Sequence, residues 1–178
     1  MPKKTAGMLD LKQAIRDIPD FPKKGIIFKD ITTLLSRGDL FRLAIDRLAD
    51  YYRDKKIDKV VGIESRGFIL GAPIAYKLGA GVVPIRKKGK LPYKTVSATY
   101  QLEYGEDTLE MHEDAIAPGQ RVLIVDDLLA TGGTARATIE LVKKLGGEIV
   151  GLAFLVELTF LNGRKNLAGV DIHTLIKY

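Results

Sequence analysis

The chain has 178 residues, 46% of them hydrophobic, which predicts one domain with a sizeable buried core. It contains no cysteine, so disulfides, thiolate nucleophiles and zinc–thiolate sites are excluded, and its two histidines, His112 and His173, lack metal-ligand spacing. The net charge is +6, but the basic residues are spread out except in the segment IRKKGK at 85–90, which suits a phosphorylated small molecule as well as nucleic acid.

Helical and extended patterns alternate along the chain. Apolar spacing predicts helices over 8–18, 39–55, 68–78 and 134–145, with Asp39 capping the second. Buried strands are predicted at 59–63, 81–85, 120–127, 148–156 and 171–177. Because the connections are short, we expect an α/β fold with a central, mainly parallel sheet and helices on both faces.

The stretch VLIVDDLLATGGTAR, residues 122–136, carries the clearest chemical signal. The segment Ala130–Thr134 includes two glycines, whose backbone can turn successive N–H groups inward at the positive end of the next helix. Thr131 and Thr134 can add hydroxyl donors or cap that helix. Neither a Walker A loop nor a G-x-G-x-x-G motif is present, so the pattern favours a monophosphate over a nucleoside triphosphate.

Asp126 and Asp127 come just before this anion-binding turn. Carboxylates repel a phosphate unless a hydroxylated or cationic group lies between them. A ribose 5-phosphate meets that condition, with its phosphate in the turn and its two secondary hydroxyls on the carboxylates. Ligands of parallel sheets bind beyond the carboxyl ends of the strands, where the aspartates and the segment ESRG at 64–67 both fall.

The stretch 122–135 resembles the phosphoribosyl-pyrophosphate motif of the type I phosphoribosyltransferases. Three further segments resemble the adenine-specific members of that family: DFPKKGIIFKDIT at 20–32, GIESRGFILGAPIA at 62–75, and RKKGKLP with YQLEYG between 86 and 105. The match covers essentially the whole chain in one register. It implies a type I phosphoribosyltransferase-like fold, a single domain over 1–178 with an N-terminal hood at about 1–35 and a β-hairpin lid at about 92–108.

The resemblance implies a purine salvage reaction in which adenine and phosphoribosyl pyrophosphate give AMP and pyrophosphate. Mg²⁺ would be held through the pyrophosphate and the ribose hydroxyls, with no dedicated protein ligand. The family's roles carry over to this chain as 5-phosphate binding by Ala130, Thr131, Gly132, Gly133 and Thr134, ribose binding by Asp126 and Asp127, pyrophosphate binding by Ser65, Arg66, Arg86, Lys87 and Lys90, and adenine binding by Ile27, Phe28 and Lys29.

In the lid, the resemblance makes Glu103 catalytic and places Tyr104 beside it. Alternation of Tyr100, Leu102 and Tyr104 agrees with a β-hairpin. The resemblance also implies a homodimer. Which cations reach the neighbouring site, and whether the Glu64–Ser65 peptide is cis, stay open at this point.

Without the resemblance, the residue types alone suggest other roles for several of these positions. Ile27 and Phe28 would be ordinary core side chains, Arg66 a surface charge, and the cluster Arg86, Lys87 and Lys90 a solvated loop. This chain also departs from the family pattern at Lys24, and at Lys29, where lysine replaces arginine. The second change matters little if only the main chain at that position contacts the base.

Two alternative functions remain open from the sequence. The first is a phosphoribosyltransferase for a 6-oxopurine or for orotate, since the phosphate motif is shared. The second is a non-enzymatic regulator that senses phosphoribosyl pyrophosphate and binds nucleic acid, although 178 residues leave little room for a helix-turn-helix domain. We expect a cytoplasmic enzyme without nucleic-acid partners. We also expect no membrane partner, since the longest apolar run, 149–156, is too short to cross a bilayer.

Overall fold

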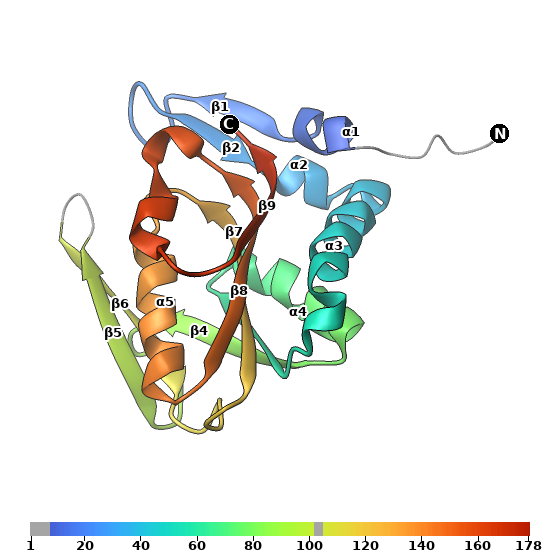
Figure 1. The fold of residues 1–178 in the computed structure, drawn as a ribbon. Helices are drawn as coiled ribbons and strands as arrows, with labels where there is room; N and C mark the ends of the chain where they lie inside the picture. The colour runs from blue at the N-terminus through green and yellow to red at the C-terminus, as the bar shows by residue number, and fades with distance from the viewer. Residues whose placement is uncertain (1–7, 102–104) are drawn as a thin grey trace. The chain divides into compact units, whose positions relative to one another are not determined.

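The computed structural model describes residues 8–101 and 105–178, which fall into two compact units divided between Arg47 and Leu48 (Figure 1). The helices are α1 (Met8–Gln13), α2 (Thr32–Leu35), α3 (Gly38–Tyr52), α4 (Arg66–Leu78) and α5 (Gly133–Lys144), with the 3-10 helices η1 (Arg53–Lys55), η2 (Thr159–Leu161) and η3 (Gly163–Leu167). The strands are β1 (Arg16–Pro19), β2 (Ile27–Asp30), β3 (Lys59–Ile63), β4 (Gly81–Lys87), β5 (Thr95–Gln101), β6 (Glu106–His112), β7 (Arg121–Leu129), β8 (Glu148–Glu157) and β9 (Ile172–Lys177).

The second unit is built on a seven-stranded sheet with the order β5-β6-β4-β3-β7-β8-β9. The five strands from β4 to β9 are parallel, and the hairpin β5–β6 joins the edge of β4 in antiparallel pairing. This arrangement confirms the α/β fold with a mainly parallel central sheet. Each predicted buried strand is present, and β4, β7 and β8 run one or two residues beyond the predicted ends.

Helices α4 and α5 lie on opposite sides of this sheet (Figure 1). Side chains that alternate along β3 and β7, including Val61, Ile63 and Ile124, belong to the buried core that contains the apolar face of α5. On the other face, Gly71 of α4 approaches Gly62 of β3 so closely that an added Cβ would lie 3.5 Å from its Cα. Small residues at this crossing bring the start of α4 down to the end of the strands.

The ends of two helices follow the glycine signals in the sequence. Helix α4 stops at Gly79, which has φ +67°, and α5 is followed by Gly146 with φ +79°. The predicted helix 39–55 corresponds to α3 followed by η1. It begins one residue early, at Gly38, so Asp39 lies inside the first turn and does not cap it. None of the described helices has the length and apolar character needed to span a membrane.

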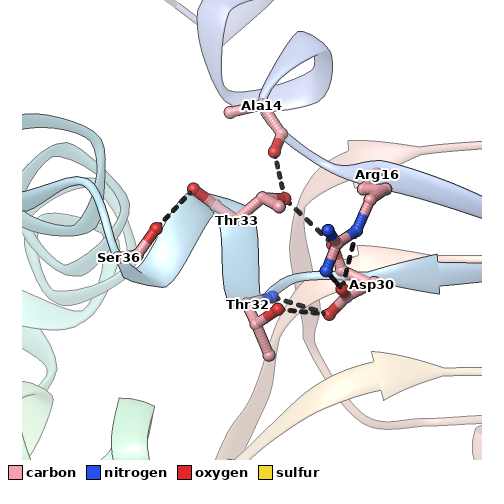
Figure 2. Close-up of polar contacts among 6 residues, drawn as sticks. All are labelled: Ala14, Arg16, Asp30, Thr32, Thr33 and Ser36. Atoms are coloured by element: carbon pink, nitrogen blue, oxygen red, sulfur yellow. Dashed lines mark hydrogen bonds and ion pairs between the residues drawn. The ribbon is translucent and has the colours of Figure 1, made fainter.

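In the first unit, the prediction of one helix over 8–18 is wrong beyond Gln13. Helix α1 ends there, and Arg16–Pro19 form β1, antiparallel to β2. Asp30 at the end of β2 explains the change, because its carboxylate accepts hydrogen bonds from Arg16 Nε at 3.1 Å and from the Thr32 N–H at 3.0 Å (Figure 2). These contacts draw Arg16 into an extended pairing, a long-range effect that local helical spacing does not contain.

The same carboxylate fixes the turn into α2. Thr32 Oγ1 donates to Asp30 Oδ1 at 2.7 Å, and Thr33 Oγ1 donates to the carbonyl of Ala14 at 2.5 Å (Figure 2). Hydrogen bonds from Arg16 and then from Thr32 lower the pKa of Asp30 to about 2. The end of β2 is therefore held by charge-assisted bonds on a carboxylate that is 7% exposed.

Candidate active site

A cavity of about 330 Å³ lies at the carboxyl ends of the parallel strands in the second unit. It is lined by the ends of β3, β4 and β7, the start of α4, the β5–β6 hairpin and the loop before α5: Ile63, Glu64, Ser65, Arg66, Lys87, Tyr100, Leu109, Asp126, Asp127, Leu128, Ala130 and Thr134. The sequence predicts seven of these as site residues: Ser65, Arg66, Lys87, Asp126, Asp127, Ala130 and Thr134. Segments more than sixty residues apart thus meet in one cavity.

The loop Ala130–Thr134, called the phosphate loop below, joins β7 to α5. Gly132 adopts the left-handed conformation with φ +86°, and α5 begins at the next residue, Gly133. An added Cβ at Gly133 would lie 3.3 Å from the ring of Tyr100. Thr131, Gly132 and Gly133 complete the turn whose ends, Ala130 and Thr134, line the cavity. A tight turn leading into a helix N-terminus presents backbone N–H groups and the positive end of the helix dipole to an anion.

The two aspartates before the loop have different surroundings. Asp127 is buried and accepts a hydrogen bond from Arg66 Nε at 2.5 Å, whereas Asp126 is half-buried and accepts the Asp127 N–H at 2.8 Å. Burial, and then the neighbouring charge of Asp127, raise the pKa of Asp126 well above its usual range. The ionised form of Asp126 is therefore costly, and further hydrogen-bond donors from a bound molecule would stabilise it.

The end of β3 and the start of α4 carry the segment 64–67. The peptide between Glu64 and Ser65 is cis, which answers the question left open by the sequence. Gly67 packs against β7 so tightly that an added Cβ would lie 2.9 Å from the carbonyl oxygen of Val125. Only a residue without a side chain brings Arg66 this close to the aspartates.

Two of the predicted pyrophosphate-binding cations, Arg86 and Lys90, and the backbone of a third, Lys87, contact Glu64. Its carboxylate accepts the Lys87 N–H at 3.0 Å, forms an ion pair with Lys90, and lies 3.4 Å from Arg86 Nε. Burial raises the pKa of Glu64, but hydrogen bonds from Lys90 and the Lys87 backbone, together with the nearby charge of Arg86, outweigh burial and lower it to about 2. Lys87 lines the cavity, while Arg86 and Lys90 do not.

The described part of the predicted lid is the antiparallel hairpin β5–β6, which confirms the strand pattern. Tyr100 and Leu109 line the cavity. Asp107 lies 3.0 Å from Lys87 Nζ and accepts a hydrogen bond from the Tyr100 hydroxyl at 3.3 Å, so one carboxylate joins the hairpin to the end of β4. Glu103 and Tyr104, the predicted catalytic and lid residues, lie outside the described residues.

The predicted adenine-binding residues lie on β2 of the first unit. Ile27, Phe28 and Lys29 pair with Pro19, Ile18 and Asp17 of β1. The side chain of Ile27 is 57% exposed, so it is not the core residue that its apolar character alone suggests. Phe28 is half-buried and meets the ring of Phe21 edge-on, with centroids 5.2 Å apart. Lys29 Nζ donates to Asp17 at 2.7 Å, so its side chain is engaged within the two-stranded sheet.

Within the described ranges 8–101 and 105–178, no three His, Asp or Glu side chains gather as a metal cage. The cavity does contain the carboxylates of Asp126 and Asp127. Mg²⁺ is commonly bound by one or two carboxylates, and its other ligands are water molecules and phosphate oxygens of the substrate. This set of donors fits a magnesium ion bound mainly through a phosphorylated substrate.

Sequence reasoning gave no individual role in the site to three residues that organise it: Glu64, Tyr100 and Asp107. Glu64 is recognisable in hindsight from its place beside Arg66 at a strand end. Tyr100 follows the alternation of the hairpin, but that pattern does not say which face meets the phosphate loop. Asp107 has no sequence signal, since its partners Lys87 and Tyr100 are 20 and 7 positions away.

Comparison with known proteins agrees with this geometry. Residues 31–168 match the family model described as the phosphoribosyl transferase domain. A curated adenine phosphoribosyltransferase of Thermotoga neapolitana is 67% identical over 170 residues, covering 96% of this chain and all of the relative. The crystal structure of adenine phosphoribosyltransferase from Rhodothermus marinus is 62% identical, with a TM-score of 0.92 over 96% of this chain and 98% of that one.

The Saccharomyces cerevisiae enzyme, whose structure contains adenine and an imino-altritol bisphosphate, is 42% identical with a TM-score of 0.89 over 94% of this chain and 97% of that one. Family, identity and coverage all point the same way. The chain belongs to the phosphoribosyl transferase domain family and, within it, to the adenine phosphoribosyltransferases.

Proposed function

We propose that this enzyme transfers the 5-phosphoribosyl group of phosphoribosyl pyrophosphate to adenine, giving AMP and pyrophosphate in purine salvage. The observation that carries the proposal is the single cavity that joins a phosphate loop, two carboxylates and the cations Arg66 and Lys87. Its volume of about 330 Å³ is within the range of small-ligand sites. The yeast relative supports the substrate class, because its structure contains both adenine and a sugar-like bisphosphate.

Phosphoribosyl pyrophosphate has three parts that match three groups of residues in and beside the cavity. Its 5-phosphate would bind the N–H groups and hydroxyls of residues 130–134, and its ribose hydroxyls would donate to Asp126 and Asp127. Its pyrophosphate would contact Ser65, Arg66 and the cations Arg86, Lys87 and Lys90. The ligand carries anionic groups at both ends and hydroxyls between them. The protein offers cations and N–H donors on either side of its two carboxylates, so the charges and donors of the two are complementary.

Adenine would be recognised by β2, with its ring against Phe28 and its polar edge read by the main chain of Ile27 and Lys29. Strand β2 belongs to a two-stranded sheet and pairs with β1, so its second edge is not part of a ladder among the described residues. Residues two apart on a strand direct their backbone groups to the same edge. Main-chain reading also explains why lysine is acceptable at position 29, where the family has arginine.

Catalysis would depend on positioning and charge stabilisation, because no covalent intermediate is required. As pyrophosphate leaves, the sugar becomes oxocarbenium-like, and water must be kept from it. The lid, residues 92–108, would cover the cavity, and Glu103 would accept the proton that adenine loses when its ring nitrogen attacks. Arg66 and Lys87 would stabilise the charge on the departing pyrophosphate. Bound Mg²⁺ would add positive charge to that leaving group.

The test is nucleotide formation from each base in turn. The protein is incubated with phosphoribosyl pyrophosphate, magnesium and adenine, guanine, hypoxanthine or orotate. We expect AMP from adenine and little product from the others, because adenine carries a donor at its 6-position where hypoxanthine carries an acceptor. Equal or better turnover of hypoxanthine or guanine would overturn the adenine assignment, and selective nucleic-acid binding without any turnover would favour a regulator.

The same proposal includes a homodimer in the cytoplasm. Ile69 and Tyr76, seven positions apart on α4, are 46% and 88% exposed, and Val82 on β4 is 49% exposed. Large exposed apolar side chains grouped on neighbouring elements are typical of a protein interface. Substituting Ile69→Glu together with Tyr76→Lys should give a folded monomer in light scattering. A cysteine-free chain acting on a phosphorylated sugar suits a reducing compartment.

We also propose that the chain works as one phosphoribosyltransferase domain, with residues 1–35 as the hood over adenine and 92–108 as the lid. The family model supports this in part, because its match begins in the first unit and ends in the second. Removing residues 1–35 should therefore abolish AMP formation rather than leave a functional enzyme. Pyrophosphate and ribose 5-phosphate binding to the remaining chain would report whether the cavity survives.

A further inference from the structure

The segment η3 (Gly163–Leu167) lies directly against the phosphate loop, 33 positions further along the chain. An added Cβ at Gly163 would lie 2.2 Å from the carbonyl oxygen of Ala130, and one at Gly132 would lie 2.7 Å from the carbonyl oxygen of Gly163. The two glycines therefore pack backbone against backbone. Asn166, an exposed residue of η3, donates from Nδ2 to the carbonyl oxygen of Thr131 at 2.7 Å.

The rest of η3 is anchored independently of the loop. Arg164 donates from Nε and Nη2 to the two carboxylate oxygens of Glu157 at 2.7 and 2.8 Å, and from Nη1 to the carbonyl of Ile172 at 3.2 Å. Leu167 is 2% exposed and belongs to the buried core that also contains the apolar face of α5. A bidentate ion pair on one side and a core leucine on the other hold η3 as a fixed support.

We infer that Asn166 is a positioning residue that sets the phosphate loop for anion binding. A peptide unit is planar and trans, so its C=O and N–H point in opposite directions. The Asn166 amide holds the carbonyl of Thr131 toward η3, and the N–H of Gly132 in the same peptide then points away from η3, free for a 5-phosphate. A loop fixed before binding loses less conformational freedom when the phosphate arrives. This role rests on the proposed function and gives its phosphate loop a specific support.

The test compares AMP and pyrophosphate, because only AMP carries the group that the loop would hold. In Asn166→Ala, we expect the Kd for AMP and the KM for phosphoribosyl pyrophosphate to rise about five-fold, since one hydrogen bond is worth roughly that factor. The inhibition constant of pyrophosphate and kcat at saturation should stay unchanged. Asn166→Asp keeps the shape but has no N–H donor, so it should lose at least as much AMP affinity.

Lys165→Gln is the matched control, because Lys165 is the exposed neighbour of Asn166 in η3. It should bind AMP like the unchanged protein, and all variants should share its melting temperature within the error. Unchanged AMP affinity in Asn166→Ala would overturn the inference, as would an equal loss of AMP and pyrophosphate affinity, which would indicate general damage. Failure of the unchanged protein to bind AMP would instead overturn the proposed function.

Discussion

Arg66 and Asp127, which the sequence assigns to the pyrophosphate and the ribose, are bound to each other: Arg66 Nε donates to Asp127 Oδ2 at 2.5 Å. The contact joins the start of α4 to the end of β7 across 61 positions of sequence. An arginine has five N–H donors in one planar group, so a single guanidinium can bond a carboxylate and a phosphate at the same time. Asp127 thereby orients the guanidinium of Arg66, and in the proposed function it would also offer an acceptor to the sugar.

This pairing predicts that Arg66→Lys fails despite keeping the charge. A lysine has no planar fork to contact a carboxylate and a phosphate at the same time. We expect the KM for phosphoribosyl pyrophosphate and the inhibition constant of pyrophosphate to rise by roughly ten-fold, the scale of a charge-assisted hydrogen bond. Steady-state inhibition kinetics measure both. The control is Arg136→Lys on α5, whose exposed guanidinium faces Glu140 at 3.6 Å and should be neutral.

Asp126→Asn should make the protein more stable and less active. The raised pKa of Asp126, caused by burial and then by Asp127, means that the folded state holds this proton more tightly than the unfolded chain. Stability from this group is therefore present at low pH and is lost as pH rises through the folded pKa. Asparagine is neutral and keeps the oxygen that accepts the Asp127 N–H.

We expect the melting temperature of Asp126→Asn at neutral pH to rise by roughly 2–4 °C, which corresponds to about 1 kcal/mol in a chain of this size. The gain should shrink as the pH is lowered, because the native carboxyl then takes up its proton. Calorimetry across a pH series measures this, and AMP formation should fall at the same time. A lower melting temperature at neutral pH would mean that the Asp126 charge is satisfied by its surroundings.

Gly132→Val should abolish AMP binding while the protein still folds. The backbone at Gly132 has φ +86°, which β-branched residues avoid, and an added Cβ would lie 2.7 Å from the carbonyl of Gly163. The loop must shift away from η3 to admit the side chain, so the N–H groups lose their arrangement. Titration calorimetry with AMP measures the loss.

Gly119→Val is the control that separates the effect of backbone strain from the effect of the clash with η3. Gly119 has φ +81°, but nothing lies within 4 Å of an added Cβ. Both variants should therefore lose stability through the strain of a positive φ, on the order of 1–2 kcal/mol. Only Gly132→Val should lose AMP affinity. If Gly132→Val bound AMP normally, the phosphate would not be held by this loop.

The parallel sheet was predictable because its signals are local. Each buried strand is a continuous apolar run bounded by glycines or polar residues, as in Lys59–Ile63, and the chain order of strands and helices limits the topology. The cluster of Arg66, Asp126 and Thr134 was also predictable, since Arg66 follows β3, and Asp126 and Thr134 lie near the end of the neighbouring strand β7 and just after it. Their residue types then indicated the ligand.

The contacts that hold the site together were not predictable, because their partners are distant in sequence. Nothing near Asn166 indicates a hydrogen bond to Thr131, and nothing near Asp107 indicates Lys87. The same reason explains the error at 14–18, where Asp30 draws Arg16 into a strand that local apolar spacing assigns to a helix. Fold and ligand class are encoded locally in this chain, whereas the supports of the site arise only from tertiary packing.

Glu103→Gln tests the lid mechanism. If Glu103 accepts the proton that leaves adenine, the role requires a carboxylate, and glutamine preserves only its size and hydrogen-bonding capacity. We expect kcat to fall by roughly 10- to 1000-fold, while the affinity for phosphoribosyl pyrophosphate changes little because residues 126–134 would hold that ligand. The control is Glu106→Gln, an exposed carboxylate on β6 that accepts a hydrogen bond from Gln101 at 2.6 Å in the same hairpin. Since both substitutions neutralise one lid carboxylate, a loss confined to position 103 would report chemistry rather than charge. Near-normal kcat in Glu103→Gln would mean that the lid acts only by keeping water from the sugar.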